Sequence, residues 1–368
     1  MNLLIKPVSG TCNMACTYCF YADEQEKRST ANAGVMTEET LSNIMRKMLA
    51  KAQGSCNIAF QGGEPTLAGL EFYKKVIWNV RYYNHKRLPV TYALQTNGYA
   101  LNEEWCRFFK EHGFLIGLSI DGTEEIHNTY RKGKDGSPTF SRVKQSAALL
   151  ERFGVPYNIL TVVNKEVAKH PKEIYAFYKK QGWKYQQYVA CLDPLYEIPG
   201  NQEYSLLPQE YGQFLIDLFQ CWFQDLKQNR QPYIRQFENY IGILLGIQPE
   251  ACEQRGTCGI QYAIEADGTV YPCDFYMLDE YKLGNINENS VSAIDRRRVE
   301  IVFLKSSEET VAACRSCTYF PICRGGCSRN RSLNEQGVYM NYFCPGYQMF
   351  LKECLLDMLQ IAQAMRQG

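Results

Sequence analysis

The chain has 368 residues, of which 45% are hydrophobic and 21% charged, and its formal net charge is +1. This length permits a full hydrophobic core and more than one domain, and the balanced charge lacks the basic excess typical of nucleic-acid binding. No apolar run approaches the length of a membrane span, and no secretory signal begins the chain. We therefore expect a cytoplasmic protein with neither a nucleic acid nor a membrane as a partner.

Sixteen cysteines are unusual for a chain expected in a reducing compartment, where disulfides are rare. Three lie near the N-terminus and eight between residues 252 and 344, in tight groups. Eleven grouped thiols are the number needed for one iron–sulfur cubane with an open iron and two fully ligated cubanes. The other five are isolated, and core or surface positions are expected for Cys56, Cys106, Cys191, Cys221 and Cys354.

The first group is the loop with Cys12, Cys16 and Cys19, in a C-x3-C-x2-C spacing after a short apolar strand at 3–5. Three thiolates of such a loop can ligate three irons of a cubane, so the fourth iron stays open for a small chelating molecule. A zinc knuckle or three reduced surface thiols is the alternative interpretation.

Strand and helix signals alternate from this loop to about residue 189. Strands are predicted at 3–5, 57–60, 90–95, 115–119, 157–163 and 185–189, with helices between them, two of which begin after the capping residues Thr37 and Asn102. This alternation predicts a parallel sheet with right-handed crossovers. Six units are too few for a closed eight-stranded barrel, so we expect a partial barrel with its site at the C-terminal strand ends.

Small and polar residues follow these predicted strands. Gly62 and Gly63 follow the second strand and would let the backbone approach a ligand, while Glu64 offers a carboxylate for an ammonium group. Ser119 ends the fourth strand and could hold a ribose or carboxylate, and Arg131 suits a carboxylate. Taken alone, each of these residues also fits an ordinary turn or a solvated side chain.

The pattern changes after residue 193. Helices at 209–227 and 237–246 are interpreted as a bridge whose dense aromatic residues belong to a core. Asp267 and Gly268, between alternating runs at 262–266 and 269–273, predict a type I′ hairpin. The remaining cysteines read Cys252-x5-Cys258, then Cys273, then Cys314-x2-Cys317-x5-Cys323-x3-Cys327, then Cys344. Their count fits two zinc sites or two four-iron clusters equally well.

Together these segments resemble a known family. The opening cysteine loop and the Gly-Gly-Glu-Pro sequence from Gly62 resemble the cluster loop and glycine motif of radical S-adenosylmethionine (SAM) enzymes. The cysteine ladder resembles the SPASM extension of peptide-modifying members. Within that group the chain is most similar to the anaerobic sulfatase-maturating enzymes, through the segments 16–21, 60–72, 94–98, 191–197 and 270–276.

The resemblance implies an α/β fold and a domain plan. A partial (β/α)6 TIM-like radical SAM barrel would cover residues 1–192, a helical bridge 193–250, a SPASM domain 251–345 and a C-terminal helix 346–368. The implied cofactors are SAM and three [4Fe-4S] clusters. Cys12, Cys16 and Cys19 would hold the first cluster; Cys252, Cys258, Cys273 and Cys327 the second; and Cys314, Cys317, Cys323 and Cys344 the third. The implied SAM contacts are Tyr18, Gly63, Ser119, Arg131 and Leu192.

The implied activity is oxidation of one Cys or Ser in an unfolded sulfatase peptide to Cα-formylglycine, with SAM cleaved to 5′-deoxyadenosine and methionine. The expected partners are that peptide and an electron donor such as flavodoxin or ferredoxin. Asp274, beside the ligand Cys273, is expected to take the proton of the substrate thiol or hydroxyl. The alternative is that Asp274 only caps the turn after the hairpin.

Two other functions compete with this one. A SPASM maturase that crosslinks or epimerises another ribosomal peptide would carry the same cysteine ladder. A non-enzymatic zinc or iron–sulfur module would carry it too, but such a module leaves the glycines at the strand ends and the open three-cysteine site unexplained.

Overall fold

The structure, a computed structural model, describes residues 1–309, 312–333 and 337–367. The chain divides into two compact units. The first comprises residues 1–119, 131–158 and 260–303, and the second comprises residues 120–130, 159–259 and 304–368. Each domain expected from the sequence is one continuous stretch of chain, whereas each of these units combines several stretches. The expected domain boundaries stay a prediction.

The first unit is built on a mostly parallel sheet. Its parallel strands are β8 (Tyr262–Ile264), β1 (Asn2–Ile5), β2 (Cys56–Phe60), β3 (Val90–Thr96) and β4 (Phe114–Ser119), in that spatial order. Next to β8, β9 (Thr269–Tyr271) and β10 (Gly284–Asn285) continue the sheet in antiparallel fashion. Parallel strands end at the same edge of a sheet, so the segments after β1, β2, β3 and β4 emerge at one edge.

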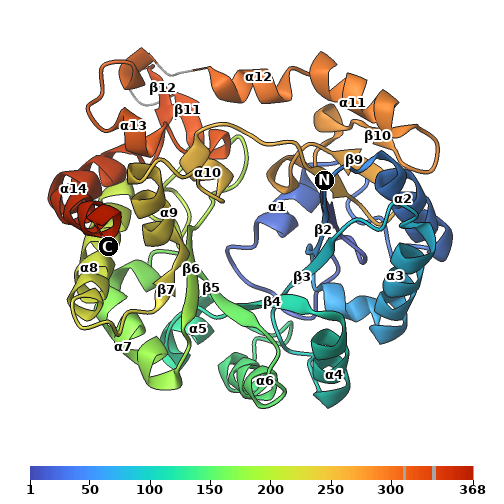
Figure 1. Cartoon of the computed structure of the whole chain (residues 1–368), viewed down its shortest axis with the longest axis horizontal. Helices are drawn as coiled ribbons and strands as arrows, with labels where there is room; N and C mark the ends of the chain where they lie inside the picture. The colour runs from blue at the N-terminus through green and yellow to red at the C-terminus, as the bar shows by residue number, and fades with distance from the viewer. Residues whose placement is uncertain (310–311, 334–336, 368) are drawn as a thin grey trace. The chain divides into compact units, whose positions relative to one another are not determined.

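Amphipathic helices connect these strands. They are α2 (Glu38–Lys51), α3 (Leu70–Tyr83), α4 (Glu103–His112) and α6 (Phe140–Arg152), and α2 and α3 pack side by side (Figure 1). The predicted caps are confirmed: the Thr37 side chain accepts from Thr40 N at 3.1 Å, and Asn102 Oδ1 accepts from Trp105 N at 3.1 Å. Leu41, Ile44 and Met48 are fully buried, as their helical spacing predicts.

The second unit contains most of β5 (Tyr157–Val163), followed by β6 (Tyr185–Ala190) and β7 (Tyr233–Ile234), which are parallel. Its main helices are α5 (Glu124–Tyr130), α7 (Pro171–Gln181), α8 (Pro208–Leu226), α9 (Arg235–Leu244) and α14 (Cys344–Gln367). Helix α14 packs on α8 and α9 (Figure 1). A Cβ on Gly212 would lie 2.8 Å from Gly346 Cα, so two glycines allow α8 and α14 to approach closely. Phe219, Trp222 and Phe237 fill the core, as expected.

The cysteine-rich part of the chain has short elements. These are α10 (Cys252–Arg255), η3 (Asp274–Tyr276), α11 (Val291–Glu300), α12 (Phe303–Glu308), α13 (Phe320–Cys323), and the antiparallel pair β11 (Arg331–Leu333) and β12 (Tyr339–Asn341). Among the described residues, no helix is both long and apolar enough to cross a membrane.

The predicted α/β class with a mostly parallel sheet is confirmed, but the type I′ turn is wrong. Gly268 N donates to Glu265 O at 2.9 Å, and Glu265 N donates to Thr269 O at 2.9 Å. Gly268 has φ +88°, whereas Asp267 does not have the positive φ that a type I′ turn requires at both central residues. The hairpin therefore closes through a longer turn that ends in a glycine bulge.

Candidate active site

The loop with Cys12, Cys16 and Cys19 joins β1 to α1 (Phe20–Glu26) at the C-terminal edge of the first unit's sheet. Neighbouring backbone holds it in place: Ala15 N donates to Lys132 O at 2.9 Å, and Glu64 N donates to Thr11 O at 2.8 Å. All three cysteines are partly buried residues. The loop is thus anchored on two sides by backbone hydrogen bonds.

The surroundings of Cys12 fit a thiolate ligand. Met14 N lies 3.4 Å from Cys12 Sγ, and Asn97 Nδ2 lies 3.6 Å from it, so two N–H donors point at the sulfur. Burial raises the pKa of the Cys12 thiol, and the hydrogen bond from Met14 partly offsets this. Donors to a cluster sulfur stabilise its negative charge, so the donor set suits an iron–sulfur cluster.

Gly63 and Glu64 support this loop. Gly63 has φ +53°, and a Cβ there would lie 2.2 Å from Thr11 O, so only glycine allows the contact with the cysteine loop. Glu64 does not offer the free carboxylate that we expect from the sequence. It is fully buried and accepts from Thr66 Oγ1 at 2.6 Å, Thr96 Oγ1 at 2.7 Å and Asn97 N at 2.7 Å. Its hydrogen bonds link the segment after β2 to the end of β3.

Ser119, Arg131 and Tyr18 also lie in the first unit, and each is less than a tenth exposed. Arg131 Nη1 donates to Tyr18 Oη at 2.9 Å, so the structure brings together two of the residues expected to contact SAM. Ser119 Oγ accepts from Gln95 Nε2 at 2.9 Å. Leu192 belongs to the second unit, and its predicted contact with SAM stays a prediction.

Asp274 is the first residue of η3; it directly follows Cys273 and lies three residues after the end of β9. Its side chain is 9% exposed, and Oδ2 accepts from Gln61 Nε2 at 3.4 Å. Cys273 Sγ lies 3.5 Å from Asp274 Oδ1. Burial raises the pKa of Asp274, while hydrogen bonds and the nearby Lys6 charge oppose the rise. The carboxylate thus adjoins a predicted cluster ligand and contacts the segment that follows β2.

A buried charge cluster near Asp274 is absent from the sequence-based site. We define it as Lys6, Glu24, Arg28 and Glu265. Glu265 Oε2 lies 3.4 Å from Lys6 Nζ and 2.7 Å from Arg28 Nη1, and Lys6 Nζ lies 4.7 Å from the centre of the Tyr21 ring. Lys6 follows β1, and Tyr21, Glu24 and Arg28 share a helical spacing. This spacing places Tyr21, Glu24 and Arg28 on one helical face. A prediction that this face is buried could have revealed the cluster from the sequence.

The second unit holds most of the remaining predicted ligands. Burial and the nearby thiols of Cys344, Cys314 and Cys317 raise the pKa of Cys323 to about 12. Burial also raises the pKa of Cys327, with contributions from Cys252 and Cys258. Cys323 thus has Cys314, Cys317 and Cys344 as electrostatic neighbours, and Cys327 has Cys252 and Cys258. The assignment of these residues to two clusters stays a prediction. Cys273 lies in the first unit, and its assignment to the Cys252 group stays a prediction.

Among residues 1–309, 312–333 and 337–367, no three His, Cys, Asp or Glu side chains lie close enough to hold a single metal ion. A cubane spreads its thiolates over several irons and so holds them further apart than one ion does.

Two family profiles match the chain. The profile of the Radical SAM superfamily matches residues 7–178, which include the first cysteine loop, Gly63, Ser119 and Arg131. The profile of the SPASM iron–sulfur cluster-binding domain matches residues 256–318. The chain is therefore a radical SAM enzyme that carries a SPASM domain.

Similarity to characterised relatives narrows this class. The cysteine-type anaerobic sulfatase-maturating enzyme of Clostridium novyi is 41% identical over 366 residues, which cover 99% of this chain and 98% of that enzyme. The serine-type enzyme of Bacteroides thetaiotaomicron is 30% identical over 372 residues, covering 96% and 89%. The chain belongs to the family of anaerobic sulfatase-maturating enzymes.

Solved structures agree with this result. The structure of native anSMEcpe with bound AdoMet and the Cp18Cys peptide has a TM-score of 0.93 and 40% identity, and the match covers 99% of both chains. Streptococcus suis SuiB bound to the precursor peptide SuiA has a TM-score of 0.62 and 16% identity, a likeness of fold alone. The resemblance drawn from the cysteine and glycine motifs is confirmed.

Proposed function

We propose that this enzyme oxidises a Cys or Ser residue of a sulfatase peptide to Cα-formylglycine, with SAM cleaved to 5′-deoxyadenosine and methionine. The family supports this reaction, and the observation that carries it is the position of Asp274. Its carboxylate is buried, adjoins the predicted ligand Cys273, and contacts Gln61, which immediately follows β2. An acid in this place can serve an oxidation in which the substrate loses both a proton and an electron.

The expected cofactors are SAM and three [4Fe-4S] clusters, held by the eleven cysteines grouped as predicted. When bound, they supply the radical that removes a hydrogen atom from the substrate β-carbon and the relay that takes the remaining electron. The residues of this chain do the rest. Arg131, Tyr18, Ser119 and the backbone of Gly63 would hold SAM, and Asp274 would accept the proton of the substrate thiol or hydroxyl.

We further infer that the preferred substrate residue is cysteine. Identity to the cysteine-type relative of Clostridium novyi is 41%, against 30% for the serine-type relative of Bacteroides thetaiotaomicron. The partner would be an unfolded sulfatase or sulfatase-motif peptide, with flavodoxin or ferredoxin as the electron donor. A cytoplasmic location fits this chemistry because that compartment keeps cysteine ligands reduced.

The deciding experiment replaces Asp274 with Asn, which keeps the side chain's shape and removes its basicity. Hydrogen abstraction does not require the base, so 5′-deoxyadenosine should still form with a Cys peptide and carry deuterium from a labelled β-carbon. Formylglycine yield should fall by about 10²–10⁴-fold, the usual effect of removing a general base. Mass spectrometry of peptide and nucleoside from one anaerobic reaction measures both products.

Asp267→Asn is the matched control, because Asp267 is an exposed carboxylate in the turn of the same hairpin. Formylglycine formation should be unchanged in that variant. A wild-type yield in Asp274→Asn would remove the base role from Asp274. If the unmutated enzyme yields no aldehyde from either Cys or Ser peptides, another peptide modification, such as crosslinking or epimerisation, becomes the better proposal.

A further inference from the structure

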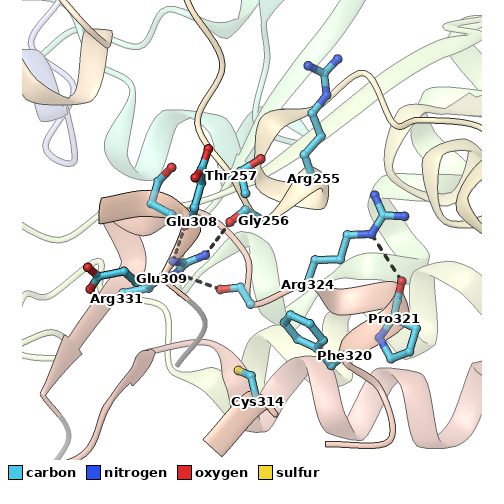
Figure 2. A pocket seen from close by; sticks show the side chains of 12 residues that line it. Arg255, Gly256, Thr257, Glu308, Glu309, Cys314, Phe320, Pro321, Arg324 and Arg331 are labelled. Atoms are coloured by element: carbon cyan, nitrogen blue, oxygen red, sulfur yellow. Dashed lines mark hydrogen bonds between the residues drawn. The ribbon is translucent and has the colours of Figure 1, made fainter. Parts of the chain in front are cut away.

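Arg331 has an unusual environment for an arginine. It begins β11, its side chain is 9% exposed, and its guanidinium donates to four backbone carbonyls. Nη2 lies 2.7 Å from Gly256 O (Figure 2) and 2.9 Å from Gly326 O. Nη1 lies 3.0 Å from Ser307 O, and Nε lies 3.3 Å from Gly325 O. Its hydrogen-bonding capacity is thus directed at the main chain.

Three of these carbonyls belong to irregular backbone, and the fourth, Ser307 O, lies in the last turn of α12. Gly256, Gly325 and Gly326 all have positive φ, at +73°, +80° and +65°. Gly256 is the C-cap of the short helix α10, directly after its last residue Arg255. A buried carbonyl without a donor is costly, and carbonyls in such turns have no neighbouring strand or helical turn to supply one. The guanidinium fills this need for three separate segments at once.

Each of these segments carries or supports a predicted cluster ligand. Gly256 lies between Cys252 and Cys258, and Gly325 and Gly326 lie between Cys323 and Cys327. Ser307 Oγ accepts from Cys258 N at 2.9 Å. A Cβ on Gly256 would lie 2.0 Å from Arg324 O. The loop between Cys252 and Cys258 therefore packs directly on the loop between Cys323 and Cys327. Arg331 therefore sits where the two loops meet.

The strand paired with β11 contributes a second side chain to the same place. Asn341 is opposite Arg331 in the β11–β12 register, and its Nδ2 donates to Gly325 O at 3.2 Å. A Cβ on Gly326 would lie 2.4 Å from Asn341 Nδ2. The two-stranded ribbon thus holds the Gly325–Gly326 turn with side chains from both strands.

A cavity of about 280 Å³ borders this junction (Figure 2). Arg331 and the predicted ligand Cys314 both line it, together with Arg255, Phe320 and Arg324. Members of both predicted ligand groups in this unit therefore lie around Arg331: its carbonyl partners belong to the loops of Cys258, Cys323 and Cys327, and Cys314 shares its cavity.

We propose that Arg331 is a positioning residue for the auxiliary iron–sulfur clusters, which holds the loops of Cys258, Cys323 and Cys327 in the arrangement that the clusters require. The inference rests on the cluster ligands given under the proposed function. An arginine suits this role because its planar group carries five N–H donors in a fixed fork. A lysine keeps the charge but has one nitrogen and cannot reach four carbonyls in three segments.

Arg331→Lys tests the role of this fork, and Arg324→Lys is the matched control. Arg324 lines the same cavity, but its Nε makes a single 3.3 Å bond to Pro321 O within its own turn. Both variants would be reconstituted with iron anaerobically, and iron release to a chelator would be followed, with electron paramagnetic resonance to identify the clusters. Loss of outer contacts to metal ligands typically weakens metal binding by 10–100-fold. We expect iron to leave Arg331→Lys at least about tenfold faster, and Arg324→Lys to match the wild type.

Wild-type iron content and release rate in Arg331→Lys would overturn the inference. If that variant does not fold, Asn341→Asp keeps the Arg331 guanidinium and the Oδ1 that accepts from Phe343 N, and removes the Nδ2 donor to Gly325 O; faster iron release would support the inference and an unchanged rate would overturn it. A wild-type protein that holds only the iron of the first cluster would instead overturn the proposed auxiliary ligands, and the inference with them.

Discussion

Arg131 is buried in the first unit, and its guanidinium donates to the Tyr18 hydroxyl. Tyr18 lies between Cys16 and Cys19, so this bond joins the cysteine loop to the segment after α5. If the guanidinium also binds the SAM carboxylate, the contact is charge-assisted and worth about 1.5–3 kcal/mol. The residue therefore offers a direct test of the predicted SAM site.

Arg131→Ala should raise the dissociation constant of SAM by roughly ten- to hundredfold, from the energy of a charge-assisted hydrogen bond. Iron content should stay at the wild-type level, because Arg131 is not a cluster ligand. Equilibrium binding of SAM to the anaerobically reconstituted protein measures the change. Lys132→Ala is the control, since it removes an exposed neighbouring charge. Equal SAM affinity in both variants would exclude Arg131 from the site.

Glu24 is a second residue with a measurable signature. It is 1% exposed, and its Oε1 accepts from Met277 N at 3.2 Å. Burial raises its pKa from 4.5 to about 8, opposed by Lys6, Met277 N–H and Arg28 and aided by Asp274. Between these two pH values the unfolded chain gives up the proton while the folded protein keeps it. Stability therefore falls as pH rises through this window, by up to about 1.4 kcal/mol per pH unit.

Glu24→Gln cannot ionise and should remove this part of the pH dependence. We expect the melting temperature of the wild type to fall more between pH 6 and pH 8 than that of Glu24→Gln. Glu26→Gln, an exposed position on the same helix, should behave like the wild type. Parallel curves for wild type and Glu24→Gln would show that Glu24 is already ionised in the folded protein at pH 6.

At the scale of elements, the connection after β2 supports the cysteine loop. Gly63 meets Thr11 backbone so closely that an added methyl group would lie 2.2 Å from its oxygen. Gly63→Ala must therefore displace the cysteine loop, in addition to the strain of a positive φ. We expect this variant to lose the iron of the first cluster and to stop cleaving SAM.

Gly54→Ala separates the two effects. Gly54 has φ +71°, but nothing lies within 4 Å of the added methyl group. That variant should lose about 1 kcal/mol of stability from the backbone conformation and keep its iron. Iron analysis and SAM cleavage assays on both proteins measure the difference. Full iron and activity in Gly63→Ala would show that the cysteine loop can shift without consequence.

At the scale of the whole molecule, the cysteine groups predict the metal content. Eleven ligands in groups of three, four and four should hold about twelve irons. Replacing Cys12, Cys16 and Cys19 together with Ala should remove about four irons and abolish SAM cleavage, because the auxiliary groups are separate in the chain. Iron and zinc analysis of anaerobically purified protein measures the outcome.

Cys221→Ser is the control for this count, since Cys221 is a half-buried isolated cysteine on α8. Its iron content should equal that of the wild type. Stoichiometric zinc in place of iron would contradict the assignment of all three groups. Loss of all iron from the triple variant would instead show that the auxiliary clusters depend on the first one.

The sequence by itself determined the elements and the chemistry class. Thr37 and Asn102 cap their helices as predicted, because capping depends on a side chain and the backbone a few residues away. The parallel pairing of β1 to β4 follows from the alternation with helices, since a helix between two strands returns the chain in the same direction. The cysteine spacings were specific enough to indicate the family, because ligand spacing reflects the geometry of the cluster.

Only the tertiary structure decided how polar residues are used. Glu64 reads as a free carboxylate in the sequence, but Thr66, Thr96 and Asn97 occupy its oxygens in the fold. Lys6 and Arg331 show no local pattern of function, and their importance comes from burial beside groups distant in the chain. The Asp267-Gly268 turn differs for a related reason: the conformation of a turn depends on the register of the strands that it joins, which local sequence does not specify.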